Sequence, residues 1–205
     1  MERLLQGYRR FRAHTWPERR ALHERLAETG QNPIAAVVAC VDSRLDPAAI
    51  FDVAPGQILV LRNVANLVPP YAPDSAYHGT SAALEFAVRG LGVANIIVMG
   101  HAQCGGVRAL LQGQTDTLTD FVLPWMGIAA RARARTLACE AVGSEAAQTR
   151  CEHETVRVSL DNLQGFPWIA ERVAAGTLRI YGMYYGIASG VLEVMGADGV
   201  FVEVS

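Results

Sequence analysis

Short, continuous apolar runs alternate with amphipathic stretches along most of this chain. Runs of aliphatic and β-branched residues are typical of strands that are buried on both faces of a sheet. Such runs predict strands at 34–39, 58–61, 95–99 and 178–184, and an alternating run predicts an edge strand at 199–204. Apolar residues at helical spacing predict helices at 81–89, 106–111, 123–140 and 152–175, the last interrupted near 165–167. Strands that alternate with helices predict an α/β fold, in which helices flank a central, mostly parallel β-sheet with an additional edge strand.

The first thirty residues form a separate amphipathic segment. Helices are predicted at 2–13 and 17–28, the second with a proline in its first turn. One stripe of the first helix is apolar, and arginines occupy its other face; the stripe consists of Leu4, Leu5, Tyr8 and Phe11. Such an arm packs either on its own domain or on a partner subunit, and the residues favour neither. We therefore expect one domain over 1–205 that carries an N-terminal helical arm over 1–30.

Composition narrows the class of protein. Hydrophobic residues make up 51% of the 205 residues, but no apolar run approaches the roughly eighteen residues that span a bilayer. We therefore expect the excess to line a core and a subunit interface, and we expect no membrane partner. A formal net charge of -2 gives no reason to expect a nucleic-acid partner. The first residues lead into an arginine-rich stretch without an apolar signal region, which predicts a cytoplasmic protein.

The basic residues exclude two kinds of chemistry. All 18 of them are arginine, so the chain has no lysine for a Schiff base or for a phosphate-binding P-loop. A nucleotide-binding α/β domain is also disfavoured, because no G-x-G-x-x-G motif follows a predicted strand.

Two polar stretches directly follow predicted strands. Cys40, Asp42 and Arg44 follow the first strand, and His101 and Cys104 follow the third along the chain. Because functional groups collect at the carboxyl ends of parallel strands, both stretches can reach one edge of the sheet. Two thiols and an imidazole are ligands that zinc prefers, and a catalytic zinc needs only three protein ligands plus water. The pattern predicts a zinc site with an open position.

A closed structural site is the alternative to an open one. A cysteine after a buried strand is by itself more often structural, and a closed zinc site would need a fourth ligand from Asp42, Cys139 or Cys151. Cys139 and Cys151 lie in a predicted helical, charged region without C-x-x-C spacing, which favours packing or surface roles. Asp42 lies two residues beyond Cys40 along an extended chain, so both side chains point the same way. It can complete the shell or stand beside a bound water.

The combination Cys-x-Asp-x-Arg and His-x-x-Cys-Gly-Gly resembles the β-class carbonic anhydrases. The match extends to 62–66, 79–80 and 100–101, and is close over 31–111, with Gln31 at a position of the plant-type subgroup. The resemblance implies that Cys40, His101 and Cys104 hold zinc. It also implies a fourth ligand that is water or hydroxide in the active form, and Asp42 in an inactive form favoured at low pH.

The resemblance implies a reaction as well. Zinc-bound hydroxide would attack carbon dioxide reversibly to give bicarbonate and a proton, which makes the expected enzyme a carbonate dehydratase, a lyase. Ionised Asp42 only accepts hydrogen bonds, so it can select the hydroxide by taking its proton, and Arg44 can hold Asp42 bidentately off the metal. The resemblance also implies the residues that contact the substrate, namely Gln31, Leu59, Val64, Phe86 and Gly105. Leu59 and Phe86 stand at two positions that are aromatic in the pocket of the plant-type subgroup.

Assembly is also implied by the resemblance. It predicts a homodimer or a dimer of dimers with active sites at the subunit interface, and arms over 1–30 that pack on the neighbouring subunit. Two other functions stay open at this stage. One is hydrolysis of COS or CS2 on the same scaffold, and the other is a non-catalytic, zinc-stabilised oligomeric binding module.

Overall fold

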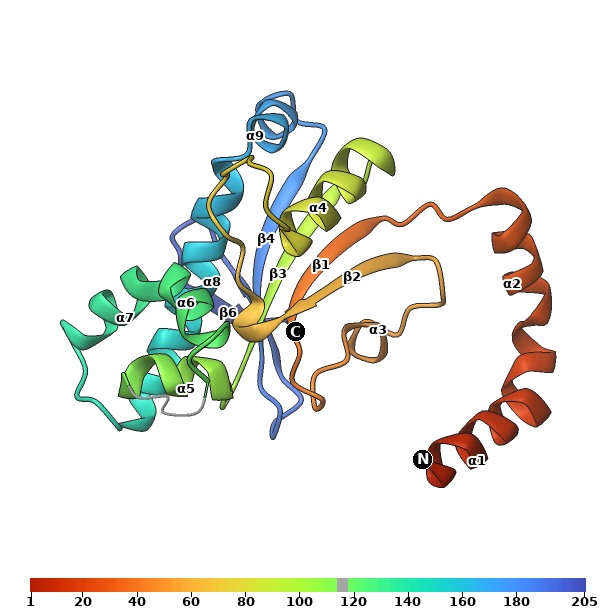
Figure 1. Ribbon diagram of the computed structural model, residues 1–205, viewed down its shortest axis with the longest axis horizontal. Coiled ribbons are helices and arrows are strands. Elements are labelled where there is room, and N and C mark those ends of the chain that lie inside the picture. The colour runs from red at the N-terminus through yellow and green to blue at the C-terminus, as the bar shows by residue number, and fades with distance from the viewer. Residues whose placement is uncertain (114–117) are drawn as a thin grey trace.

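The computed structural model describes residues 1–113 and 118–205. These residues form a six-stranded sheet in the order β2-β1-β3-β4-β5-β6 (Figure 1). The first four strands run parallel, whereas β5 and β6 each pair antiparallel with the strand before them. The strands are β1 (Ala35–Cys40), β2 (Ile58–Asn63), β3 (Asn95–His101), β4 (Arg179–Tyr185), β5 (Leu192–Met195) and β6 (Phe201–Glu203). The predicted α/β class is therefore confirmed.

The register places the carboxyl ends of β1 and β3 side by side. Ala39 of β1 lies opposite Met99 of β3, so the next residue on each strand emerges at the same edge of the sheet. β1 is buried along its whole length, as its continuous apolar run predicts. Cys40 ends β1 and His101 ends β3, and both residues are buried. Two distant parts of the chain thus deliver their polar side chains to one place.

A long helix packs against the sheet beside the carboxyl ends of these strands. The 20-residue helix α8 (Glu145–Gln164) packs across β3 and β4. Glycines allow the close approach: a Cβ on Gly100 would lie 2.7 Å from Val156 Cγ2, and one on Gly182 would lie 2.9 Å from Leu160 Cδ1. The other helical segments of the body are α3 (Pro47–Ile50), η2 (Val64–Asn66), α4 (Gly79–Glu85), η3 (Phe86–Gly90), α5 (Gly105–Gln112), α6 (Val122–Met126), η4 (Gly127–Ala129), α7 (Ala130–Leu137) and α9 (Pro167–Ala174).

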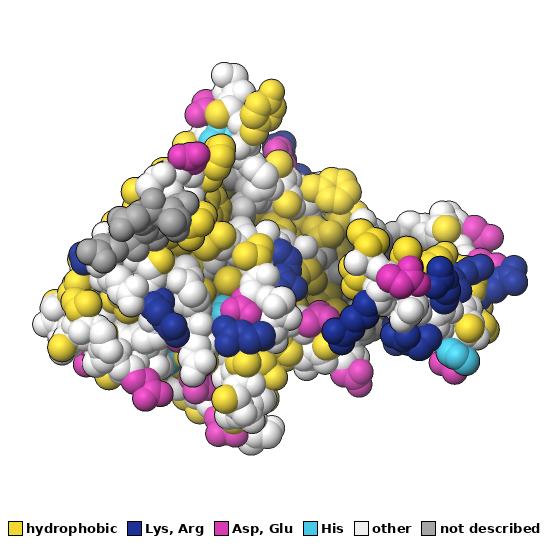
Figure 2. Space-filling view, turned by 60° about the horizontal axis from the view of Figure 1, so that its bottom comes forward, with side chains coloured by type: hydrophobic (Ala, Val, Ile, Leu, Met, Phe, Trp, Pro, Cys, Tyr) yellow, Lys and Arg dark blue, Asp and Glu magenta, His cyan; other side chains and the backbone are white. Residues whose placement is uncertain are grey.

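The N-terminal arm extends away from the sheet. It consists of α1 (Glu2–Arg10), a π-helical segment η1 (Phe11–Thr15) and α2 (Trp16–Thr29), and contains no buried residue. Its apolar stripe is open to solvent in the single chain, with Leu4 72% and Tyr8 60% exposed. Arginine side chains gather along the arm with apolar side chains among them (Figure 2). The apolar stripe of α1 is therefore not covered by its own domain, although Leu26 of α2 lies against Gly56 of the body.

Several element boundaries differ from those predicted. β5 was not predicted, because a strand of four residues gives too short an alternation to detect. α3 was also missed, although Asp46 caps it through a 3.1 Å hydrogen bond from the Ala48 N–H and Pro47 opens it. α8 begins at Glu145 rather than 152, because the Ser144 hydroxyl accepts a 3.0 Å hydrogen bond from the Ala147 N–H. In the described part of the chain, no helix has the length and apolar character needed to cross a membrane.

Candidate metal centre

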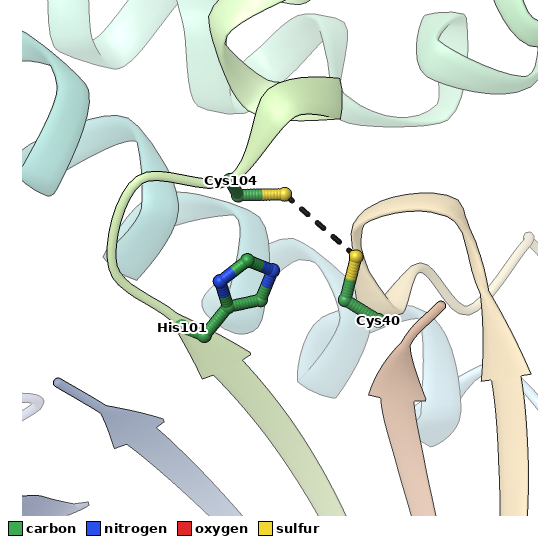
Figure 3. Close-up of side chains that lie close together, drawn as sticks. All are labelled: Cys40, His101 and Cys104. Atoms are coloured by element: carbon green, nitrogen blue, oxygen red, sulfur yellow. Dashed lines mark hydrogen bonds between the residues drawn. The ribbon is translucent and has the colours of Figure 1, made fainter. Parts of the chain in front are cut away.

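Three side chains meet at the carboxyl edge of the sheet. Cys40 comes from the end of β1, His101 from the end of β3, and Cys104 from the residue before α5 (Figure 3). One ligand atom from each lies within 4.8 Å of the others, and all three residues are buried. The two sulfur atoms are 3.9 Å apart. The structure thus brings together the three residues that the sequence nominated as ligands.

The turn between His101 and Cys104 determines how the imidazole is presented. Gln103 adopts a left-handed backbone with φ 58°, which reverses the chain so that both side chains face inward. His101 Nδ1 lies 2.9 Å from the Ala102 carbonyl oxygen. A carbonyl only accepts hydrogen bonds, so Nδ1 carries the proton and Nε2 carries the lone pair. Nε2 is buried and has no hydrogen-bond partner among the described residues.

The two thiols form an electrostatically coupled pair. The Cys104 thiol donates toward the Cys40 sulfur and lowers the pKa of Cys40 to about 4, against the opposing effect of burial. The backbone N–H groups of Asp42 and Ala65 contribute in the same direction. The pKa of Cys104 is raised because its proton is shared with Cys40 and because it is buried. Thiolate, which is the metal-binding form, is therefore favoured at Cys40 even before a cation is present.

A carboxylate–guanidinium pair stands beside this group. Arg44 Nε lies 3.0 Å from Asp42 Oδ1 and Arg44 Nη2 lies 2.7 Å from Asp42 Oδ2, which is a bidentate arrangement. The Arg44 N–H also donates to Asp42 Oδ1 at 2.9 Å. These bonds hold the pKa of Asp42 well below its usual range. Asp42 Oδ2 lies 3.9 Å from His101 Nε2, so the ionised carboxylate faces the three ligand atoms without joining them.

Arg62 fixes the backbone that carries this pair. Its Nε donates to the Cys40 carbonyl oxygen at 2.9 Å, and its Nη2 donates to the Asp42 carbonyl oxygen at 2.7 Å. Arg44 Nη2 lies 3.3 Å from the Gln103 carbonyl oxygen, which links the two ligand segments. Arg62 belonged to a matched motif, but its role had no signal in the sequence because the carbonyl groups it binds come from another strand.

The predicted substrate residues divide into two sets. Gly105 directly follows Cys104, and half-buried Val64 packs against the cluster that contains both thiols. Gln31 precedes β1 and is exposed, Leu59 pairs with Ala36 near the start of β1, and Phe86 is 53% exposed at the start of η3. Cys40 lies four residue steps beyond Ala36 along β1, which is about 13 Å at 3.3 Å per residue. Gln31 lies four residues before β1 begins, and the Phe86 ring lies beside Gly90, shortly before β3 begins. All three residues are therefore on the side of the sheet where β1 and β3 start, away from the ligand residues at the strand ends.

The remaining thiols stay outside this group. Cys139 is exposed and Cys151 is buried among apolar residues, as expected for surface and packing roles. His78 lies 2.7 Å from Asp74 in a local ion pair. Among the described residues, Cys40, His101 and Cys104 are the one group with metal-ligand geometry.

The donor set fits zinc. It offers two sulfurs, one of them strongly acidified, and an imidazole whose buried Nε2 lone pair has no other partner in the described structure. Three protein ligands are the number that catalytic zinc sites use, with one position left for water or substrate. An α/β sheet that carries such a site at its carboxyl edge, with an ion pair beside it, defines the class of zinc enzymes with an open coordination position.

Comparison with known proteins narrows this class to one family. The family model described as carbonic anhydrase matches residues 35–192. Beta carbonic anhydrase 3 of Arabidopsis thaliana is 36% identical over 203 residues, which cover 97% of this chain and 78% of that protein. The chloroplastic beta carbonic anhydrase 5 of the same plant is 36% identical over 178 residues, 86% of this chain and 58% of that protein. The chain belongs to the β-carbonic anhydrases, consistent with a plant-type subgroup.

Solved structures agree with this assignment. The β-carbonic anhydrase CcaA superposes with a TM-score of 0.93 at 32% identity, over 100% of this chain and 92% of that one. CafA of Aspergillus fumigatus gives a TM-score of 0.83 at 28% identity, over 97% and 91% of the two chains. A tetrameric β-carbonic anhydrase of Sordaria macrospora gives 0.82 at 25% identity, over 100% and 98%. The match to CcaA includes the N-terminal arm, because it covers 100% of this chain.

Proposed function

We propose that this protein catalyses the reversible hydration of carbon dioxide to bicarbonate and a proton. The observation that carries the proposal is the buried His101 Nε2, which has no protein partner in the described residues and belongs to a cluster with two cysteine sulfurs. A buried nitrogen lone pair without a partner is costly, and a zinc ion held by Cys40, His101 and Cys104 would satisfy it. When bound, zinc supplies a nucleophile near neutral pH by acidifying water, an effect for which carbonic anhydrase is the standard example.

Asp42 and Arg44 orient the attacking oxygen in this proposal. The Asp42 side chain is only 16% exposed. Arg44 holds its carboxylate through two side-chain hydrogen bonds. An ionised carboxylate accepts hydrogen bonds and cannot donate them. Asp42 would therefore accept a hydrogen bond from the O–H of the attacking oxygen, which leaves an oxygen lone pair to face the substrate carbon. Arg44 keeps the carboxylate in this position and away from the metal ligands.

Substrate contacts are proposed to come from two chains. Val64 and Gly105 border the ligand cluster in the same chain, and the backbone at Gly105 has open space where a Cβ would stand. Gln31, Leu59 and Phe86 lie toward the other end of the sheet, and in this proposal a neighbouring subunit supplies them. An amide donor from Gln31 would then bind a bicarbonate oxygen.

Self-association follows from the same reasoning. We propose that the 1–30 arm of one copy packs on a second copy of this single-domain chain, giving a homodimer or a dimer of dimers. The uncovered stripe on α1 supports this, because an amphipathic helix gains stability by burying its apolar face. The tetrameric relatives from Sordaria macrospora support it as well. Location in the cytoplasm stays a prediction of the sequence.

The decisive experiment measures zinc content and carbon dioxide hydration on the same purified protein. We expect one zinc per chain, stopped-flow hydration above the uncatalysed rate, and loss of activity on chelation that added zinc restores. A zinc-loaded protein without hydration activity would contradict the proposal and favour a non-catalytic binding module. Parallel assays with COS and CS2 test hydrolysis on the same scaffold, and faster turnover of either substrate than of carbon dioxide would replace the proposed reaction.

A further inference from the structure

A buried carboxylate that is not a metal ligand contacts the backbone of the ligand Cys104. We infer that Glu152 and Gln148, one turn apart on α8, are positioning residues that hold Cys104 in its metal-binding place. The inference deepens the proposed function and rests on it, because it assigns a role toward the same zinc site. Neither residue belongs to the motifs that identified that site.

The two side chains bind both polar groups of the Cys104 backbone. Glu152 Oε1 accepts a hydrogen bond from the Cys104 N–H at 2.8 Å. Gln148 Nε2 donates to the Cys104 carbonyl oxygen at 3.1 Å and to Glu152 Oε1 at 2.5 Å. Residues four apart on a helix lie on one face, so α8 presents an acceptor and a donor side by side. Cys104 is thereby fixed from behind, on the backbone side of its sulfur.

Tyr184 completes the arrangement from the sheet. Its hydroxyl donates to Glu152 Oε2 at 2.7 Å, and Tyr184 pairs in β4 with Gly100, the residue before His101. Glu152 thus joins β4, the neighbour of the strand that ends at His101, to the loop that carries Cys104. The close packing of α8 on Gly100 and Gly182 keeps this frame rigid.

The burial of Glu152 shows that its carboxyl group is a structural part of the interior. The residue is 2% exposed, and no arginine forms an ion pair with it in the described part of the chain. Three neutral donors bind its two oxygen atoms, from the Cys104 backbone, Gln148 and Tyr184. Glu152 therefore acts by position, through the hydrogen bonds that hold Cys104.

Backbone support matters here because the turn before Cys104 is conformationally unusual. Gln103 has φ 58°, a region that non-glycine residues adopt at a cost. Without the hydrogen bonds from Glu152 and Gln148 to the Cys104 backbone, this turn can relax and carry the Cys104 sulfur away from Cys40 and His101. Partners that orient metal ligands in this way typically change metal affinity or activity by roughly 10–100-fold.

The test compares zinc affinity in full-length variants by competition with a chromophoric chelator. We expect Glu152→Gln and Gln148→Ala each to weaken zinc binding by roughly 10–100-fold. Cobalt-substituted Gln148→Ala should show an altered visible spectrum, because the geometry at the Cys104 sulfur changes. The matched control is Glu145→Gln, which makes the same chemical change at an exposed position on the same helix and should bind zinc as tightly as the unmodified protein.

Zinc affinity within twofold of the unmodified protein in both variants, with an unchanged cobalt spectrum, would overturn the inference. If Glu152→Gln does not fold, as judged by circular dichroism, the affinity and spectrum of Gln148→Ala decide the matter alone. These readouts do not depend on hydration activity. Failure of the proposed reaction would instead appear as a zinc-loaded, unmodified protein that leaves carbon dioxide unchanged.

Discussion

The metal centre and the N-terminal arm are built in opposite ways. The centre lies in the interior, where Cys104 and His101 are at most 1% exposed and each is held by contacts from its own chain. The arm has no buried residue and presents an apolar stripe to solvent. One region is complete within a single chain, whereas the other has an apolar surface that lacks a partner.

This difference separates what one chain can do from what an assembly must do. The described structure contains every proposed zinc ligand together with the Asp42–Arg44 pair. It leaves Gln31, Leu59 and Phe86 away from those ligands, so substrate contacts from these residues need a second copy. Metal binding and assembly should therefore be separable by mutation.

Replacing a ligand should have the largest effect. We expect Cys104→Ser or His101→Ala to reduce zinc content to near zero and hydration to the background rate, because two remaining ligands bind zinc weakly. The measurement is zinc by atomic absorption together with stopped-flow hydration. The assembly measured by analytical ultracentrifugation should remain, since the arm extends away from the sheet (Figure 1) and contains none of the ligand residues.

Cys139→Ser provides the matched control, because Cys139 is an exposed free thiol outside the cluster. It should keep both zinc and activity. Full zinc content in the Cys104 variant would show that Cys104 is not a ligand, and loss of assembly in that variant would show that metal binding and association are coupled after all.

Charging the apolar stripe of the arm should produce the reverse pattern. In Leu4→Glu/Tyr8→Glu, we expect the sedimenting mass to fall toward that of one chain, because burying two carboxylates in an interface is unfavourable. Zinc content should stay the same while activity falls, since Gln31 of a neighbour is no longer supplied. Arg10→Glu introduces the same residue on the opposite face of α1 and should leave the mass unchanged. A monomer with full activity would contradict the two-chain site.

Weakening the ion pair should affect activity less than ligand loss. Arg44→Lys keeps the charge but removes the bidentate grip on Asp42. A hydrogen bond to a charged group contributes about 1.5–3 kcal/mol, so we expect kcat/KM to fall by roughly 10–100-fold with zinc retained. Arg108→Lys, at an exposed position on α5, should change neither quantity. Unaltered kcat/KM in the Arg44 variant would remove this pair from the mechanism.

The fold and the ligand cluster were largely predictable from the sequence for a common reason. Buried parallel strands are continuous apolar runs, and the alternation of strands with helices fixes where their carboxyl ends meet. That logic placed Cys40 and His101 together, and the structure agrees. It could not locate β5 or the start of α8 at Glu145, because short strands and single capping hydrogen bonds give weak local patterns.

Residues that support the site were less predictable than its ligands. Glu152 reads as an ordinary polar residue of a helix, and only the packing of α8 against β3 and β4 brings its carboxylate to Cys104. Arg62 likewise acts through carbonyl groups at the end of β1 and in the loop that follows it. Such contacts depend on tertiary structure, which periodicity does not encode. The roles assigned to Asp42, Arg44, Gln31 and the pocket residues stay predictions until the variants are measured.

The last prediction concerns stability alone, and comes from a buried histidine outside the metal centre. His153 stacks on Phe201 with ring centroids 4.2 Å apart, and its Nε2 has no hydrogen-bond partner among the described residues. Burial, and then the nearby charge of Arg157, lowers the pKa of His153 from 6.5 to about 4, partly opposed by Glu154. Glu193 Oε2 also faces the ring, 3.7 Å from Nε2.

This lowered pKa predicts a pH-dependent stability. Below about pH 6.5 the unfolded chain binds a proton at His153 that the folded chain does not. The free energy of unfolding therefore decreases as the pH is lowered from about 6.5 to the folded pKa of about 4. The full loss is roughly 3 kcal/mol, from about 1.4 kcal/mol per pH unit. His153→Phe keeps the stacked ring without a titratable group, so urea unfolding should show the variant gaining stability relative to the unmodified protein between pH 6.5 and 4. Parallel curves for the two proteins over that range would mean that His153 is solvated, and that this part of the interior is less closed than the metal centre.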